Sequence, residues 1–164
     1  MRVEDEIHYP VSPAEVAAML ADPEFVERKM VATHALSHDV EVVGTADGAF
    51  TVTTRRTMPT SDLPDLARSF VGETIDVRQV EAWEAAAPDG SRAGTVVVEV
   101  LGAPLRLTGT LRLAPDGGGT TETLAGDLKA SVPLVGSKLE KAAEPAFMAA
   151  VRKEHEVGKE WLGG

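Results

Sequence analysis

The stretch GSKLEKAAEPAFMAAVRKEHEVGKEWL, residues 136–162, decides the fold, because it predicts one long amphipathic helix at the end of the chain. Its apolar residues form one broad stripe at helical spacing, and Pro145 interrupts the stripe where a kink is expected. The charged residues alternate in sign along the stretch, which is typical of a solvated helix face. They are Lys138, Lys141, Arg152, Lys153 and Lys159 with Glu140, Glu144, Glu154, Glu156 and Glu160, and His155 beside them is expected to be solvent-exposed.

Before this helix, the chain from about His34 to Val132 has the alternation of β-strands, in about six segments separated by turn residues. The clearest segment runs from Leu105 to Leu113, where leucines alternate with arginine and threonine. This pattern predicts antiparallel strands with one buried face and one face in water.

The N-terminal segment predicts a strand over Val3–Tyr9, whose apolar face is interrupted by Asp5, so this end is expected to be wet. Ser12, followed by proline and by a glutamate three residues on, predicts the start of a helix. Asp22, also followed by proline, predicts a second short helix through about Met30.

The connection between Thr57 and Glu73 is longer than a hairpin turn. Its apolar residues at helical spacing, from Leu63 to Phe70 behind a cap at Ser61 or Asp62, predict a short amphipathic helix. Long connections often carry function, so this segment is a candidate lid.

This order of elements predicts an α+β fold: a curved antiparallel sheet of about seven strands wraps around the C-terminal helix, with two short helices after the first strand. We expect residues 1–164 to form one domain. Such a sheet can enclose a cavity.

The same order resembles the START-like (SRPBCC, helix-grip) superfamily, which includes the birch-pollen allergen, lipid-transfer START domains and polyketide cyclases. The stretches Tyr9–Val16 and Asp22–Phe25 are similar to that superfamily's first strand and helix pair. The stretch Val132–Glu140, the ending Glu160–Leu162, Gly72 and Glu81-Ala82-Trp83 resemble a bacterial branch of unknown function. These motifs belong to the scaffold, so the resemblance implies the fold and no catalytic residue.

Composition excludes several classes of function. Cysteine is absent, which excludes a thiol nucleophile, thiolate zinc sites and disulfides. The net charge of −10 disfavours binding to nucleic acid or to anionic lipid headgroups. No signal peptide or membrane-spanning segment is evident, so we expect a cytoplasmic protein without stable membrane anchoring. No metal or nucleotide cofactor is expected, and the oligomeric state is not predicted.

Polar residues on the inward faces of the predicted strands are the candidate ligand contacts. His34 and His38 share one strand face about 13 Å apart, which is too far for the two side chains to chelate one metal. Either histidine could act as a general base or form a hydrogen bond with a ligand, or it could lie at the end of the sheet and bond to the backbone or to water. Arg56 also faces the core, and its partner is either a protein carboxylate, Glu81 or Glu99, or a ligand carboxylate.

The strand from Ile75 to Trp83 does not alternate cleanly, so either it carries a bulge or Glu81 and Trp83 enter the cavity. Glu81 could then pair with Arg56 or act as an acid or base. Four apolar residues complete the predicted lining: Phe50, Phe70, Leu107 and Phe147.

The sequence contains no nucleophile elbow, HExxH motif or phosphate-binding loop. Three functions fit it. The favoured one is a carrier or sensor that binds a hydrophobic small molecule or lipid. An enzyme of the polyketide-cyclase kind would use Arg56, Glu81 or a histidine to polarise a carbonyl group. A protein-interaction module would instead have its cavity filled by Phe50, Phe70, Trp83 and Phe147.

Overall fold

The computed structural model describes residues 1–163, which form seven strands and four helices. In chain order the elements are β1 (Arg2–Tyr9), α1 (Pro13–Leu20), α2 (Pro23–Ala32), β2 (Ser37–Gly44), β3 (Phe50–Pro59), α3 (Asp65–Arg68), β4 (Thr74–Trp83), β5 (Arg92–Leu101), β6 (Leu105–Asp116), β7 (Gly119–Ala130) and α4 (Gly136–Trp161).

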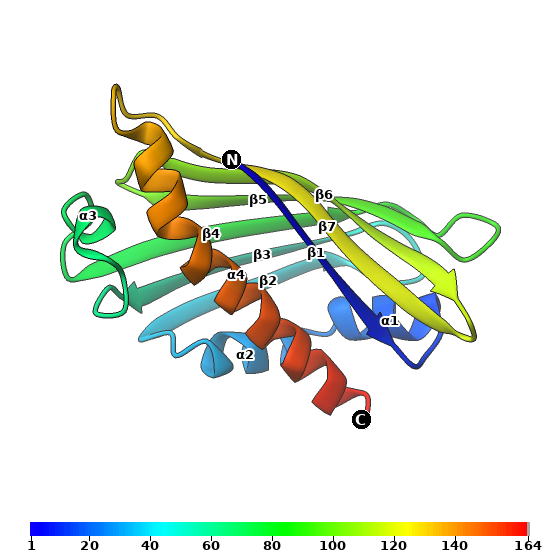
Figure 1. The fold of residues 1–164 in the computed structure, drawn as a ribbon. Helices are drawn as coiled ribbons and strands as arrows, with labels where there is room; N and C mark the ends of the chain where they lie inside the picture. The colour runs from blue at the N-terminus through cyan, green and yellow to red at the C-terminus, as the bar shows by residue number, and fades with distance from the viewer. Residues whose placement is uncertain (164) are drawn as a thin grey trace.

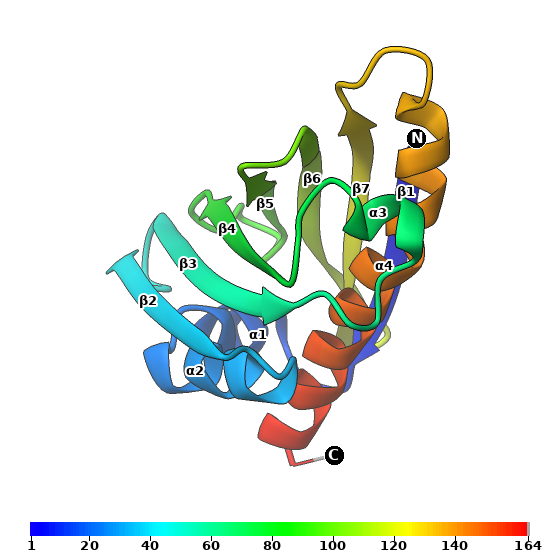
Figure 2. The ribbon, with the colours of Figure 1, turned by 90° about the vertical axis from the view of Figure 1, so that its left-hand side faces the viewer.

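The seven strands form one antiparallel sheet in the order β1-β7-β6-β5-β4-β3-β2. The sheet curves around α4, which crosses its concave face from the end near α3 to the end near α1 and α2 (Figures 1 and 2). This is the predicted helix-grip fold.

The two short N-terminal helices begin where their capping residues predict. The Ser12 side chain accepts a hydrogen bond from the Glu15 backbone N–H at 3.3 Å, and Asp22 Oδ1 accepts one from Glu24 N–H at 2.9 Å. Each cap is followed by a proline in the first turn, where its missing N–H leaves no bond unmade.

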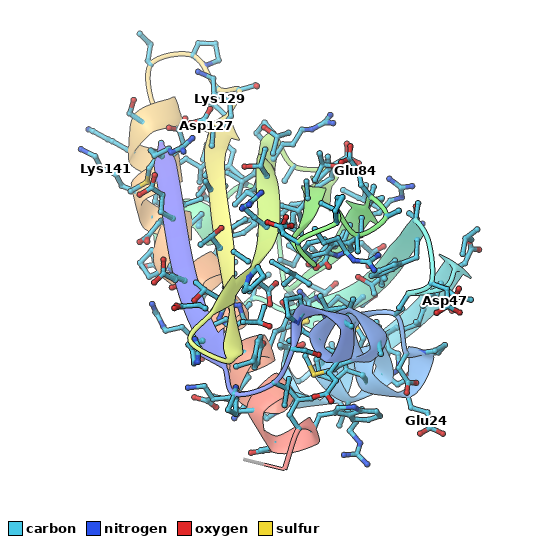
Figure 3. The ribbon with its side chains drawn as sticks, turned by 90° about the vertical axis from the view of Figure 1, so that its right-hand side faces the viewer. Glu24, Asp47, Glu84, Asp127, Lys129 and Lys141 are labelled. Carbon is cyan, nitrogen blue, oxygen red and sulfur yellow. The ribbon has the colours of Figure 1, made fainter. Side chains whose placement is uncertain are left out.

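Alternation along the strands separates the core from the solvent face. On β6, Leu107, Leu111 and Leu113 are buried against the inside of the sheet. Asp127 and Lys129 lie on the outward side of β7 and are exposed (Figure 3). The inward leucines and valines pack against the buried side of α4, so the concave face and this helix together form the core.

A pair of glycines faces each other across β6 and β7, where Gly109 pairs with Gly126. A Cβ atom at Gly109 would lie 2.7 Å from the Ala125 carbonyl oxygen, and one at Gly126 would lie 2.8 Å from that of Thr108. Neither position has room for a side chain, and glycines at such sites are typical of a strongly bent part of a sheet.

Two predicted elements differ from the structure. Strand β2 begins at Ser37, because the chain leaves α2 through a turn in which His34 has a positive φ of 63°. His34 and His38 therefore do not share a strand. Helix α3 spans four residues instead of the eight predicted, and its N-cap is Pro64, without a side-chain hydrogen bond, rather than Ser61 or Asp62.

Strand β4 is regular, which decides between the two alternatives for its mixed face. Its pairing with β3 runs from Phe50–Trp83 to Pro59–Thr74 without interruption, so there is no bulge. Polar side chains on its inward face therefore do enter the interior. No helix within residues 1–163 is both long enough and apolar enough to cross a membrane.

Candidate functional site

A cavity of about 580 Å³ lies between α4 and the concave face of the sheet. Most of its lining is apolar and comes from the strands, α3 and the first half of α4. The main apolar contributors are Leu63, Phe70, Ile75, Val77, Val96, Val98, Val100, Leu105, Leu107, Leu111, Leu139 and Phe147. The volume lies within the range of about 300–1,000 Å³ that is usual for small-molecule sites.

The nine residues predicted to contact a ligand divide into two groups. Six of them line the cavity: His34, Arg56, Phe70, Glu81, Leu107 and Phe147. The other three lie outside it. Phe50 and Trp83 stack on each other with ring centroids 6.4 Å apart, and His38 forms an ion-pair contact with Glu27.

Arg56 is buried, and its partners differ from those predicted. Its Nη1 donates a hydrogen bond to Thr33 Oγ1 at 2.9 Å and lies 3.5 Å from Glu154 Oε1. Glu81 and Glu99 are not its partners. The alternation along a strand predicts the face on which an arginine lies. It does not predict the partner, because Glu154 lies on α4 and reaches Arg56 only when the helix packs over the sheet.

Glu81 and Glu99 have partners of their own. Glu81 accepts hydrogen bonds from Gln79 Nε2 at 2.9 Å and from Trp83 Nε1 at 3.2 Å. Glu99 pairs with Arg106 at 3.1 Å, on the other face of the sheet from the cavity. Glu81 is therefore the only one of the two that lines the cavity.

Two residues in the second half of α4 depart from the predicted solvated face, whereas Arg152, Lys153, Glu156, Lys159 and Glu160 are exposed as predicted. The Glu154 and His155 side chains are only 12% and 16% exposed, and both line the cavity. His155 Nδ1 lies 3.4 Å from Asp5 Oδ2, and the Asp5 side chain is 22% exposed. Burial lowers the pKa of His155, and the nearby Asp5 opposes that shift. Glu154 and His155 are covered because α2 and β1 pack against α4.

The first half of α4 holds a further exception to the predicted solvated face. Glu140 is buried and accepts a hydrogen bond from the Ala130 backbone N–H at 3.0 Å, which ties the helix to the end of β7. This bond lowers the pKa of Glu140. The lysines of α4, including Lys138 and Lys141, are exposed as predicted.

Lys29 and Glu122 are buried charged residues in the cavity lining that the sequence analysis missed. Burial lowers the pKa of Lys29, but Glu154, Glu81 and Glu122 outweigh it and raise that pKa. Burial, with added repulsion from Glu81 and Glu154, raises the pKa of Glu122 to about 8, although Lys29 opposes the shift. These shifts favour the ammonium form of Lys29 and the protonated form of Glu122.

Both residues could have been found from the sequence. Glu122 shares the inward face of β7 with Thr120, Leu124 and Leu128. Lys29 lies three residues after Val26 and four after Phe25, on the buried side of α2. A charge at an apolar position was the signal in each case.

Tyr9, at the end of β1, lines the cavity together with Lys29 and Glu122. Its phenol is buried against Gly158 of α4, where a Cβ atom would lie 2.6 Å from the hydroxyl oxygen. Burial and the neighbouring glutamates raise the pKa of Tyr9, so the phenol stays neutral. Within residues 1–163, no cluster of three or more histidine, aspartate or glutamate side chains is arranged to hold a metal ion.

A comparison with known protein families identifies the family of this chain. The family model "Protein of unknown function (DUF2505)" matches residues 4–162. The chain belongs to the DUF2505 family. Uncharacterized proteins of Mycobacterium tuberculosis and Mycobacterium bovis are 26% identical to it over 118 residues, which are 71% of this chain and 67% of theirs.

Solved structures share the fold of this DUF2505 chain at low sequence identity. TTHA0849 from Thermus thermophilus has a TM-score of 0.63 at 18% identity, covering 98% of this chain and 95% of its own. A STAR-related lipid transfer protein from Xanthomonas axonopodis has a TM-score of 0.63 at 15% identity, and the match covers 99% of this chain and 86% of that protein. Ara h 8.0201 has a TM-score of 0.56 at 15% identity, and the match covers 100% of this chain and 99% of that protein. The fold is therefore START-like, as the sequence resemblance implies.

Proposed function

We propose that this protein binds a hydrophobic small molecule or lipid in the cavity between the sheet and α4, as a carrier or a sensor. The observation that carries the proposal is the apolar cavity of about 580 Å³. A void of this size lined by leucine, valine and phenylalanine lacks the contacts of a packed core, and an apolar ligand would restore them.

Two further observations support this function. The side of α4 that faces the cavity is rich in small residues, including Ala143, Ala146 and Ala150, which leave the space open. A lipid transfer protein is among the proteins with this fold, although one fold serves many functions. A cavity filled by four aromatic residues, which the protein-interaction alternative requires, does not agree with the stacking of Phe50 on Trp83 away from the cavity.

The first test is native mass spectrometry of the protein purified without detergent, followed by organic extraction and identification of any bound molecule. Fluorescence titration with the neutral apolar probe N-phenyl-1-naphthylamine measures whether the cavity is accessible. Ala143→Phe places a phenyl ring in the cavity and should abolish probe binding, whereas the matched variant Ala86→Phe, on an exposed loop, should leave it unchanged. Equal probe binding by both variants would place the probe elsewhere and contradict the proposal.

A second candidate function is an enzyme that acts on the bound molecule, and the polar groups in the cavity favour it. Glu122, with its pKa near 8, lies with Glu154 and Lys29 in the lining, and such a group can move protons at neutral pH. The test is α-proton exchange of a hydrophobic 1,3-diketone in deuterated water, followed by NMR. Enzyme-dependent exchange that Glu122→Gln removes would support catalysis, and exchange at the buffer rate would leave binding alone as the function.

A further inference from the structure

One carboxylate oxygen in the cavity lining has no partner. Glu122 Oε2 is buried and makes no hydrogen bond with any described residue. Glu122 is 8% exposed and lines the cavity. A buried polar atom without a partner costs free energy, so this oxygen marks where a ligand group can bond.

A donor without a direct partner belongs to the same group. Lys29 is buried, its Nζ lies 5.2 Å from the centre of the Phe25 ring, and no hydrogen bond joins it to another described residue. The carboxylates of Glu81, Glu122 and Glu154 all act on its charge. This part of the cavity therefore presents a free donor and a free acceptor.

Acidic side chains outnumber basic ones around this site. Lys29 and Arg56 line it together with three glutamates: Glu81, Glu122 and Glu154. The nearby Asp5 and His155 contact each other. A ligand carboxylate would add an unbalanced negative charge next to three carboxyl groups, which is costly in a buried place.

Arg56 already has protein partners, so it does not need a ligand carboxylate to pair with. Its guanidinium group already contacts Thr33 and Glu154. The hydrogen-bonding group that fits is neutral, and it both donates and accepts. A hydroxyl group has this property, since it carries one donor hydrogen and two acceptor lone pairs.

The polar and apolar parts of the lining lie at opposite ends of α4. The polar groups come from α2, from the second half of α4 and from the strand positions of Arg56, Glu81 and Glu122. The segment around α3 and the first half of α4 contribute Leu63, Phe70, Leu139 and Phe147. Figures 1 and 2 show α2 and α3 at opposite ends of α4. A ligand in this cavity would therefore have one polar end and an apolar body.

We infer that the ligand is a hydrophobic alcohol: its hydroxyl donates to the free oxygen of Glu122 and accepts from Lys29, and its apolar body lies toward α3. This inference rests on the proposed function, because it names the class of molecule that the cavity would take.

The test is a series of ligands with matched chains, measured at pH 7 by displacement of N-phenyl-1-naphthylamine. The series contains 1-dodecanol, its acceptor-only analogue 1-methoxyundecane, dodecanoate and dodecylamine, all below their aggregation concentrations. We expect the alcohol to bind at least about ten-fold more tightly than the ether and the carboxylate, because each leaves a buried group unpaired or adds a buried charge.

Each outcome is decisive. Dodecanoate or dodecylamine binding as tightly as dodecanol would overturn the alcohol inference and leave the proposed function standing. Equal binding of the alcohol and the ether would also overturn it, because no donated hydrogen bond would be needed. Failure of the probe and of all four ligands to bind would contradict the proposed function itself.

Two substitutions at one position test whether Glu122 reads the hydroxyl. Glu122→Gln keeps a donor and an acceptor, so the preference for alcohol over ether should stay within about three-fold of its original value. Glu122→Leu removes both and should reduce that preference at least about three-fold. Glu99→Leu, on the outer face of the sheet, is the matched control and should change nothing. An unchanged preference in Glu122→Leu, with the protein folded by circular dichroism, would exclude Glu122 from the site and overturn its assigned role.

Discussion

Replacing Glu122 with glutamine should change how the stability of this protein depends on pH. The ordinary pKa of a glutamate is 4.5, and burial beside Glu81 and Glu154 raises that of Glu122 to about 8. The folded protein thus keeps a proton that the unfolded chain releases above pH 4.5, so stability falls as pH rises from about 4.5 to about 8. One pKa unit corresponds to about 1.36 kcal/mol, so the shift amounts to at most about 5 kcal/mol. Water that enters the cavity reduces this value.

The Glu122→Gln variant has no proton to lose. Its free energy of unfolding, relative to the unchanged protein, should rise by about 1 kcal/mol per pH unit between pH 5 and pH 8 and then level off. The gain at pH 9 should be roughly 2–5 kcal/mol. Urea unfolding at pH 5, 6, 7, 8 and 9, followed by circular dichroism, measures it, with Glu99→Gln as the control. Asp5, Lys29, Glu81 and Glu154 also face this site and interact with the Glu122 charge, so the difference measures Glu122 together with its effect on these groups.

A difference between Glu122→Gln and the unchanged protein that stays constant from pH 5 to pH 9 would refute the reasoning. It would mean that Glu122 has an ordinary pKa in the folded protein and is therefore charged at neutral pH.

Three further predictions concern stability and are measured by urea unfolding at pH 7. Arg56→Met should destabilise the fold by about 3–5 kcal/mol, because it leaves the buried Glu154 carboxylate unpaired, and adding Glu154→Leu should restore most of that loss. No recovery in the double variant would show that the arginine acts through packing alone. Gly158→Ala should cost about 1–2 kcal/mol, since its Cβ atom would lie 2.6 Å from the Tyr9 hydroxyl oxygen, against a smaller gain in helix propensity. Tyr9→Phe should partly rescue it, and a neutral or stabilising Gly158→Ala would contradict this close approach. Asp22→Ala removes the cap of α2 and should cost about 1 kcal/mol, so an unchanged midpoint would show that this cap contributes nothing.

Much of the fold could be predicted from the sequence, because local signals decide it. The caps at Ser12 and Asp22 are satisfied by the next few residues, and strand alternation follows from the two faces of a sheet. Helix α3 was predicted too long, since helical spacing over Leu63–Phe70 does not show that Pro64 begins the turn. Such boundaries depend on how the connection meets the rest of the molecule.

The candidate site could be predicted only in part. Arg56 and Glu81 were assigned to the interior because their strands place them there, and both line the cavity. Glu154 and His155 were assigned to solvent, because alternating charges on a helix are typical of an exposed face. The helix is covered there by α2 and β1, and no periodicity within the helix records that.

By itself, the sequence determined the order of the elements, the inward face of each regular strand and the absence of cysteine chemistry. These properties depend on neighbours in the chain or on composition alone. Only the tertiary structure decided that Arg56 pairs with Glu154, that Asp5 pairs with His155 and that Glu122 lies near Lys29. These residues are far apart in the chain, and they meet only because the sheet curves around α4.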